Sequence, residues 1–184
     1  MKERDKMLLG EMYNPADEEL YSDRMHAKNA CHRFNSLDAT DIGTRTTILK
    51  KLLGKTGEHP HIEPNFYCDY GYNIEVGDNF YANHNLVILD CAKVKMGNNV
   101  FIGPNCGIYT ACHPTNSEER NSGIEFAKPI TIGNNVWLGG NVCIMAGVTI
   151  GDNVVIGAGS VVTKNIPSNK IAVGNPCKPI KDIN

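Results

Sequence analysis

A histidine at the start of a long polar segment is the residue of this sequence best suited to proton transfer. His113 directly precedes Pro114, which favours an extended backbone at His113 itself. A neutral imidazole at the edge of a rigid scaffold, with a polar loop after it, is well placed to act as a general base. Composition alone favours the simpler alternative of an ordinary exposed loop histidine, so the assignment depends on the surrounding elements.

The histidines and cysteines give little support to metal chemistry. A zinc-dependent hydratase would need three histidines around the metal, but His113 is followed by Glu118 rather than by a histidine five residues later, and His84 is the only other histidine in the repeats. The seven cysteines are dispersed and contain no Cys-x-x-Cys pair, which argues against a disulfide framework and a zinc ribbon. We therefore predict that no metal is required and that the protein works in a reducing cytoplasm.

A six-residue repeat from Ile130 to Asn165 defines the scaffold that must position these groups. An aliphatic residue returns every six positions, and a second aliphatic line runs two residues ahead of it; the first line is Ile132, Leu138, Ile144, Ile150, Ile156 and Val162. Six is the period of the hexapeptide β-helix. Gly, Asn and Asp at the corners supply the left-handed backbone conformations that tight turns need. We predict a mainly β fold, a left-handed parallel β-helix.

The same period continues upstream with two interruptions. Val76, Ala82 and Ile88 keep it, and a slip of two residues then indicates an insertion near Asp90. The pattern stops in the polar segment between residues 109 and 128, and a loop of this length inside a regular solenoid is more often functional than not. The tail after Lys164 is predicted to be a strap over the last coil.

Residues 1–57 differ in kind from the rest, because they are charged and show helical spacing. One helix is expected from Asn14-Pro15 to Asn35, and a second from Ala39 or Asp41 to Leu53. We predict that this segment caps the open end of a β-helix formed by residues 58–184, since terminal repeats need such covers. A further hypothesis is that it also walls a substrate site.

The charge and hydrophobicity of the chain exclude some partners. Its net charge is −2 over 184 residues, with both signs scattered, so no basic face indicates nucleic acid or membrane binding. No apolar run approaches the roughly 18 residues needed to span a bilayer. We therefore expect small-molecule partners.

Several long motifs carry a resemblance to a known family: GPNCGIYTACHP, GIEFAKPITIGNNVWLGGNV, AGVTIGDNVVIGAGSVVTKNIP, AVGNPCKPIK and FYCDYGYNIEVGDNFYANHN. Together with the helical N-terminal segment, they resemble the maltose, galactoside and nodulation O-acetyltransferases over nearly the whole chain, and the maltose (sugar) group most. The resemblance implies transfer of acetyl from acetyl-CoA to a sugar hydroxyl by direct attack. His113 matches the family's catalytic base, and Asn83 matches its transition-state-stabilising position.

The resemblance also implies an acceptor site. Asp69 and Asp90 lie in segments that line the family's sugar pocket, and Asp17 lies in the N-terminal segment that reaches it. Carboxylates suit sugar hydroxyls because their oxygens accept several hydrogen bonds. Glu125 could orient His113 or bind the acceptor, and a solvated loop charge is an equal alternative.

Six residues match family positions along the cofactor. The backbone N–H of Gly140 matches a contact to the thioester end of acetyl-CoA, and two lysines stand where the family tends to have arginines near the phosphates. The complete set is Gly140, Ala158, Thr163, Lys164, Lys178 and Lys181. The alternative for each is a turn residue or a solvated surface charge.

Other functions on this fold stay open at this point. Within the acetyltransferases, the main alternative acceptor is the hydroxyl of a drug or an amino acid. Outside them, a non-catalytic scaffold is disfavoured by the intact His113 and Asn83. We also predict a homotrimer with each site between two subunits, because the coils present flat outer faces and the family pairs His113 with groups from a neighbour.

Overall fold

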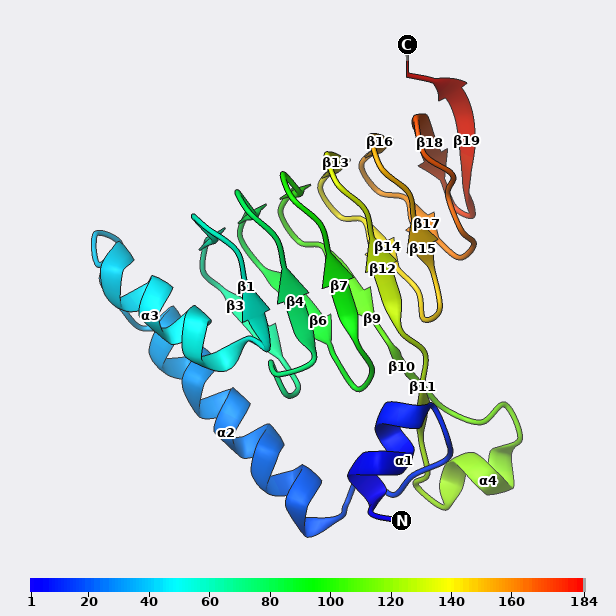
Figure 1. The fold of residues 1–184 in the computed structure, drawn as a ribbon. Coiled ribbons are helices and arrows are strands. Elements are labelled where there is room, and N and C mark those ends of the chain that lie inside the picture. The colour runs from blue at the N-terminus through cyan, green and yellow to red at the C-terminus, as the bar shows by residue number, and fades with distance from the viewer. Residues whose placement is uncertain (184) are drawn as a thin grey trace.

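The computed structural model describes residues 1–183 and shows a three-sided parallel β-helix with helices against its N-terminal end (Figure 1). Asn184, the last residue of the predicted β-helical segment, lies outside the described residues. The strands follow one another around three faces. Face I contains β1 (Lys55–Thr56), β4 (Ile74–Val76), β7 (Val94–Met96), β12 (Ile130–Ile132) and β15 (Thr149–Ile150). Face II contains β2 (His61–Ile62), β5 (Tyr81–Ala82), β8 (Phe101–Ile102), β13 (Val136–Leu138), β16 (Val154–Ile156), β18 (Lys170–Gly174) and β19 (Cys177–Asp182). Face III contains β3 (Phe66–Cys68), β6 (Leu86–Leu89), β9 (Gly107–Tyr109), β14 (Cys143–Ile144) and β17 (Val161–Val162).

The two aliphatic lines of the repeat form the interior of the β-helix. Ile132, Leu138 and Ile144, from three successive faces, are each at most 1% exposed, as is the preceding line at Ile130 and Val136. Each strand pairs in register with its counterpart one coil away, so that equivalent positions stack. The predicted parallel β-helix is therefore confirmed, and burial of stacked aliphatic side chains is its main stabilisation.

Asparagine and glycine have different roles at the corners, whereas the sequence predicted that both supply left-handed backbone conformations. Asparagines such as Asn99 and Asn135 adopt the left-handed conformation, with φ of 55° and 56°, and their amides hydrogen bond from coil to coil at 3.1 Å. The glycine two residues earlier does not. A Cβ at Gly97 would lie 2.9 Å from the backbone nitrogen of Asn134, so glycine is needed there for close approach of the next coil.

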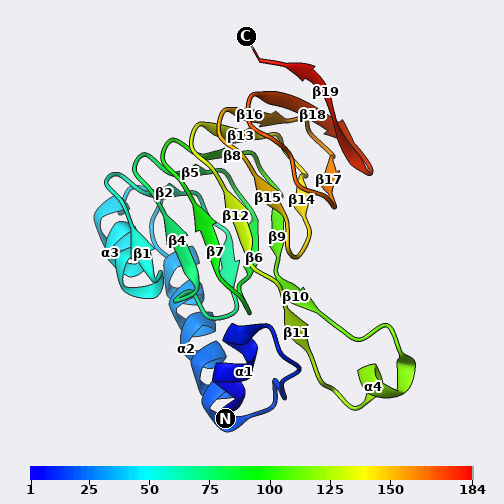
Figure 2. The ribbon, with the colours of Figure 1, turned by 45° about the vertical axis from the view of Figure 1, so that its right-hand side comes forward.

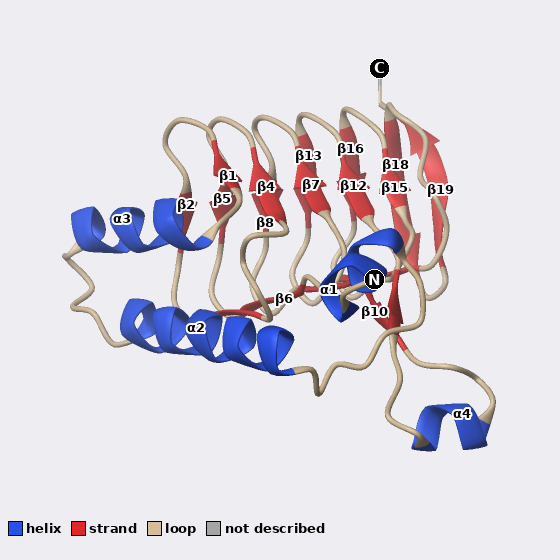
Figure 3. Cartoon of the chain, turned by 60° about the horizontal axis from the view of Figure 1, so that its bottom comes forward, coloured by secondary structure: helices blue, strands red, loops and turns tan. Residues whose placement is uncertain are grey.

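The N-terminal helices are α1 (Glu3–Leu9), α2 (Glu18–Asn35) and α3 (Ile42–Leu52), of which α2 and α3 match the prediction. Figure 3 shows α2 and α3 against the first coil. Their buried residues, including Ala27, Phe34 and Leu49, join the interior of the β-helix in one hydrophobic cluster. The capping role predicted for this segment follows from that contact. The helix α1 was not predicted, because it is short and Met7 is its one buried residue within the described chain.

Three segments expected to be irregular contain regular structure. The segment after Tyr109 folds back on itself, with β10 (Ala111–Cys112) antiparallel to β11 (Phe126–Ala127) and α4 (Ser117–Asn121) at the tip (Figure 2). The linker around His61 is the face II strand β2. The C-terminal tail is a hairpin that extends face II rather than a strap, since β18 pairs with β16 and β19 with β18. The boundary at residue 57 stays a prediction, and β1 already pairs with β4 before it.

Candidate active site

His113 lies directly after β10, where the chain leaves the corner between faces III and I and projects from the β-helix (Figure 2). In the hairpin formed by β10 and β11, Ala111 pairs with Ala127, so the two arms of the protruding loop run side by side. This brings Glu125 to His113, with 3.9 Å between Glu125 Oε1 and His113 Nε2. The His113 side chain is 55% exposed, which leaves it open to a substrate.

A cavity of about 540 Å³ lies beside this pair. Its walls come from the N-terminal segment, α2, the corner segments of the first two coils and the hairpin. The lining residues are Pro15, Ala16, Tyr21, Arg24, Lys28, Asp69, Tyr70, Leu89, Cys91, Ala111, His113 and Glu125. Three residues expected at the acceptor site or as the base, His113, Asp69 and Glu125, are thus brought together, and the hypothesis that the N-terminal segment walls the site agrees with this arrangement.

Tyr13, in the N-terminal segment, holds Glu125 in place. The backbone N–H of Tyr13 donates to the carbonyl of Glu125 at 2.9 Å, and the N–H of Glu125 donates back at 3.0 Å. The Tyr13 hydroxyl also donates to Glu125 Oε2 at 2.8 Å. Tyr13 is 1% exposed, and burial raises the pKa of its phenol, so it stays a donor. One carboxylate oxygen is therefore fixed while the other faces His113.

The rest of the cavity combines a charge-rich wall with neutral groups. Arg24 donates to the Tyr70 hydroxyl at 2.8 Å and to the Pro15 carbonyl at 2.6 Å, which fixes its guanidinium. Burial raises the pKa of Asp69, an effect that the Cys91 thiol and the positive charge of Arg24 partly offset. Burial also raises the pKa of Cys91, so its thiol stays neutral. The cavity offers both acceptors and donors to a ligand rich in hydroxyls.

Two predicted acceptor residues, Asp17 and Asp90, make structural hydrogen bonds in this structure, and their predicted contact with the acceptor stays a prediction. The Asp17 carboxylate caps α2 by accepting from the backbone N–H groups of Glu19 and Leu20, at 3.1 and 3.3 Å. Asp90 is 0% exposed, and its Oδ1 accepts from the N–H groups of Asp69 and Tyr70, at 3.0 and 2.9 Å. Neither residue lines the cavity, and neither is carried into the proposed mechanism.

The pH dependence of stability tests this placement of Asp90. Burial raises the pKa of Asp90 to about 6 from its ordinary 3.8, and Oδ2 has no partner among the described residues. Because the folded-state pKa lies above the unfolded one, the stability from the protonated carboxyl is complete below about pH 4 and is lost as pH rises through about 6. In the variant Asp90→Asn (D90N), an amide that cannot ionise replaces this carboxyl, so the variant lacks this loss of stability.

From about pH 4.5 to about pH 7.5, the free energy of unfolding of D90N should therefore rise relative to the wild type by about 2 kcal/mol. Urea unfolding of both proteins at the two pH values measures this difference. Parallel pH profiles for the two proteins would show that Asp90 is not a buried, ionising carboxyl.

Asn83 lies at the other end of face III, in a second cavity of about 580 Å³. That cavity is open, with an aromatic wall from face II and a floor of corner residues. It is lined by Tyr81, Asn83, Phe101, Ile102, Gly103, Pro104, Trp137, Gly139 and Gly140. The Asn83 Oδ1 accepts from the His84 N–H at 2.7 Å, and its amide nitrogen has no acceptor among residues 1–183. The structure thus places the expected oxyanion donor Asn83 beside Gly140.

Of the other predicted cofactor residues, three lie at the corners at the two ends of face III, and two lie on β19 of face II. Ala158 lies one coil beyond Gly140; a Cβ at Gly139 would be 2.6 Å from the Ala158 nitrogen. Thr163 and Lys164 follow β17, at the corner that His113 leaves two coils earlier. Lys178 and Lys181 are exposed on β19. None of these residues lines either cavity within the described chain.

His113 and Asn83 do not share a cavity in one chain, because a full side of the β-helix separates their corners. Six residues at about 3.3 Å each make this side up to about 20 Å long. Two side chains that act on one substrate must lie within a few ångströms of it. If His113 and Asn83 act on one substrate, as the family resemblance implies, the two corners of one chain are two half-sites.

Between Met1 and Ile183, no group of three or more His, Cys, Asp or Glu side chains is arranged to hold a metal ion. Over the same range, no helix combines the length and the apolar composition needed to cross a bilayer.

Comparison with known proteins identifies the family. Residues 6–57 match the maltose acetyltransferase hexapeptide capping motif, and residues 129–164 match the bacterial transferase hexapeptide over six repeats. The crystal structure of a maltose O-acetyltransferase from Clostridium difficile 630 is 51% identical, with a TM-score of 0.99, over 100% of this chain and 98% of that one. This chain belongs to the hexapeptide-repeat acetyltransferases.

Two further relatives of this acetyltransferase share its full extent. Galactoside O-acetyltransferase from Escherichia coli K12 is 43% identical over 180 residues, which is 98% of this chain and 89% of the relative. A hexapeptide-repeat acetyltransferase from Vibrio cholerae, crystallised with acetyl coenzyme A, is 35% identical with a TM-score of 0.92, over 100% of both chains. The family predicted from the motifs is therefore confirmed.

Sequence reasoning missed several residues of the acetyltransferase cavity. Arg24, Lys28, Tyr70 and Cys91 line the cavity and Tyr13 holds Glu125, but no role was predicted for any of them. Their contacts join the N-terminal segment to corners more than 40 residues away, as Arg24 and Tyr70 show.

Proposed function

We propose that the acetyltransferase moves the acetyl group of acetyl-CoA to a hydroxyl of a small sugar, such as maltose or glucose, by direct attack. The observation that supports this most is the His113 cavity. It places one imidazole among the two carboxylates of Asp69 and Glu125 and the guanidinium of Arg24. A ligand with several hydroxyls can use all of these groups, whereas an acceptor with one hydroxyl cannot. The names of the maltose and galactoside relatives agree with this proposal.

In the proposed mechanism, His113 takes the proton of the acceptor hydroxyl as its oxygen attacks the thioester carbonyl. The pKa of a sugar hydroxyl lies far above 7, so proton removal accompanies attack. Glu125, held by Tyr13, orients the imidazole or contacts the acceptor. The amide of Asn83 donates to the tetrahedral oxyanion, and the N–H of Gly140 contacts the thioester end. Collapse of the intermediate breaks the C–S bond, and the proton held by His113 passes to the departing sulfur, so that CoA leaves as a thiol, His113 is neutral again and no acyl-enzyme forms.

The outer faces of the β-helix support a homotrimer with sites between subunits. The outward residues of face I are polar: Lys55, Glu75, Lys95, Thr131 and Thr149. Those of faces II and III are mostly apolar or aromatic: Tyr81, Phe101, Trp137 and Val155 on face II, and Tyr67, Val87, Cys143 and Val161 on face III. Trp137 is 57% exposed and Phe101 49%. Two different apolar faces suit a head-to-tail ring, in which face II of one subunit meets face III of the next.

Such a ring would join the two half-sites and divide the cofactor contacts between subunits. His113 would come from one subunit, together with Thr163 and Lys164 at the same corner. Asn83 would come from its neighbour, with Gly140 and Ala158. Lys178 and Lys181, exposed on β19, would attract the phosphates of CoA as point charges.

A survey of acceptors tests the proposed function. Release of CoA thiol from acetyl-CoA would be followed with glucose, maltose, galactosides and chitin-like sugars, and with drug and amino-acid hydroxyls as the comparison set. We expect rapid, acceptor-dependent release with at least one sugar and only background hydrolysis with the comparison set. Rapid turnover confined to the non-sugar hydroxyls would replace the sugar by that acceptor class.

A further inference from the structure

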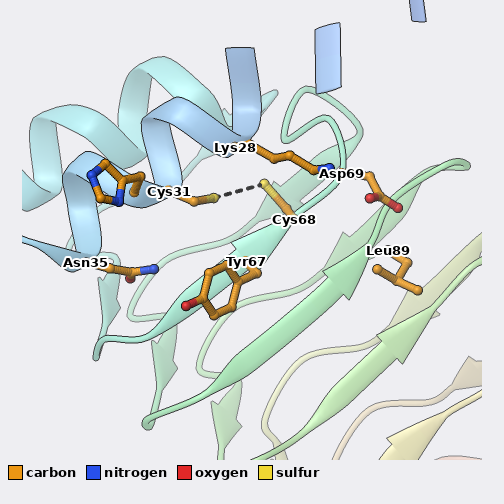
Figure 4. A pocket seen from close by; sticks show the side chains of 8 residues that line it. Lys28, Cys31, Asn35, Tyr67, Cys68, Asp69 and Leu89 are labelled. Carbon is orange, nitrogen blue, oxygen red and sulfur yellow. Dashed lines mark hydrogen bonds between the residues drawn. The ribbon is translucent and has the colours of Figure 1, made fainter. Parts of the chain in front are cut away.

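A third cavity, of about 370 Å³, lies between α2 and the outer side of β3 (Figure 4). It is lined by Lys28, Cys31, His32, Asn35, Tyr67, Cys68, Asp69 and Leu89. Small-molecule pockets range from about 300 to about 1,000 Å³, so this cavity is of a size that holds a ligand. None of the roles assigned above to CoA or to the reacting hydroxyl uses it.

This cavity adjoins the one beside His113. Lys28, Asp69 and Leu89 line both. In Figure 4, Asp69 and Leu89 lie at one side of the cavity, Asn35 lies at the other, and Tyr67 is between them. A ligand that starts beside His113 can therefore continue past Asp69 along α2.

The lining combines an apolar floor with a polar rim. Cys31 and Cys68 are 1% and 6% exposed, with 3.8 Å between their sulfur atoms, and behave as small apolar groups. Tyr67 adds a ring that is 51% exposed in the single chain; it lies on β3, the end strand of face III, the face proposed above to meet the next subunit. Lys28 and His32 are exposed on α2 and supply polar groups at the rim, with the Lys28 side chain directed toward Asp69 (Figure 4). A sugar ring has the matching chemistry, since its C–H face is apolar and its edge carries hydroxyls.

The cavity is rigid at its far end. Asn35 donates from its amide nitrogen to the Phe66 carbonyl at 3.0 Å and accepts from the Phe66 N–H at 2.8 Å, which fixes the end of α2 to β3. Both helix and strand are therefore held at a constant separation, and the cavity exists before any ligand arrives. Preformed sites cost less ordering entropy on binding.

We propose that this cavity is a second acceptor subsite, which holds the second ring of a disaccharide or longer sugar while the ring to be acetylated lies beside His113. The proposal rests on the proposed function and deepens it. The enzyme then distinguishes acceptors by length, because a single ring fills only the cavity beside His113.

The test compares two tryptophan substitutions on α2. His32→Trp fills the new cavity from its exposed rim, and His32 does not itself line the cavity beside His113, whereas Arg33→Trp places the same side chain one residue further on, outside both cavities. We expect H32W to lower kcat/KM for maltose by about tenfold and to leave kcat/KM for glucose unchanged. R33W should change neither. Tyr67→Ala, which removes the ring on face III, should also reduce selectivity for maltose over glucose.

The outcomes separate the subsite from the function on which it rests. Equal losses with glucose and maltose in H32W, or no loss with either, would overturn the subsite and leave the acetyltransferase proposal standing. Dissociation of a Tyr67→Ala oligomer in sedimentation, with equal losses for both sugars, would assign this surface to the subunit contact instead. Failure of the unmodified enzyme to acetylate any sugar would overturn the proposed function and the subsite together.

Discussion

Replacing His113 by alanine should lower kcat by at least about 100-fold, the lower end of what general-base catalysis contributes. The reason is geometric: His113 is the one imidazole of the cavity that also holds Asp69 and Glu125, as far as the described chain shows. Its side chain is 55% exposed and lies outside the hydrophobic clusters, so the fold should be unaffected. Thiol release under saturating acetyl-CoA and acceptor measures kcat, and thermal unfolding checks the fold.

His26→Ala is the matched control for this substitution. His26 is exposed on α2 and lines neither the catalytic cavity nor the cavity around Asn83, so its removal should leave kcat unchanged. A His113→Ala enzyme with wild-type turnover would remove His113 from the mechanism.

Replacing Asn83 by alanine should lower kcat by about 100- to 1,000-fold, the usual loss when one oxyanion donor is deleted. Asn83 has a second task, since its Oδ1 accepts from the His84 N–H in the corner. Asn83→Asp separates the two tasks, because aspartate keeps that acceptor and loses the donating amide. We expect N83D to lose at least as much activity as N83A.

Asn98→Ala is the control for corner geometry. Its Oδ1 accepts from the Asp78 N–H at 2.8 Å in the corner between faces I and II, away from both half-sites. The N98A substitution should lower the free energy of unfolding and leave kcat almost unchanged. If N83D retained wild-type kcat, the amide of Asn83 would not be the oxyanion donor.

The architecture was predictable because a β-helix repeats its environment. Equivalent positions are buried to the same extent in every coil, so the aliphatic residues Ile132, Ile144 and Ile156 repeat the same signal at a fixed spacing. The protruding segment was predictable because the repeating aliphatic pattern stops there. Its internal order was not, because β10 and β11 have two residues each and are specified by pairing across 16 residues, with Ala111 opposite Ala127.

The site was only partly predictable for a related reason. Asp69 and Asp90 are both acids that follow a strand of face III, and the sequence does not distinguish them. In the structure Asp69 opens onto the cavity, while Asp90 turns inward to bind two N–H groups of the preceding coil. Burial of a carboxyl depends on which neighbouring coil supplies the donors, which is information that a single repeat does not carry.

In the proposed ring, each active site is completed by two subunits, with His113 from one and Asn83 from the next. Mixed trimers of His113→Ala and Asn83→Ala subunits, separated by different affinity tags, test it most directly. A mixed ring contains either two H113A subunits and one N83A subunit, or the reverse. In both cases, one of the three interfaces of a head-to-tail ring pairs an intact His113 with an intact Asn83. We therefore expect about one third of wild-type activity from two inactive parents. Mixed trimers as inactive as the parents would contradict it, since both residues would then have to act within one chain.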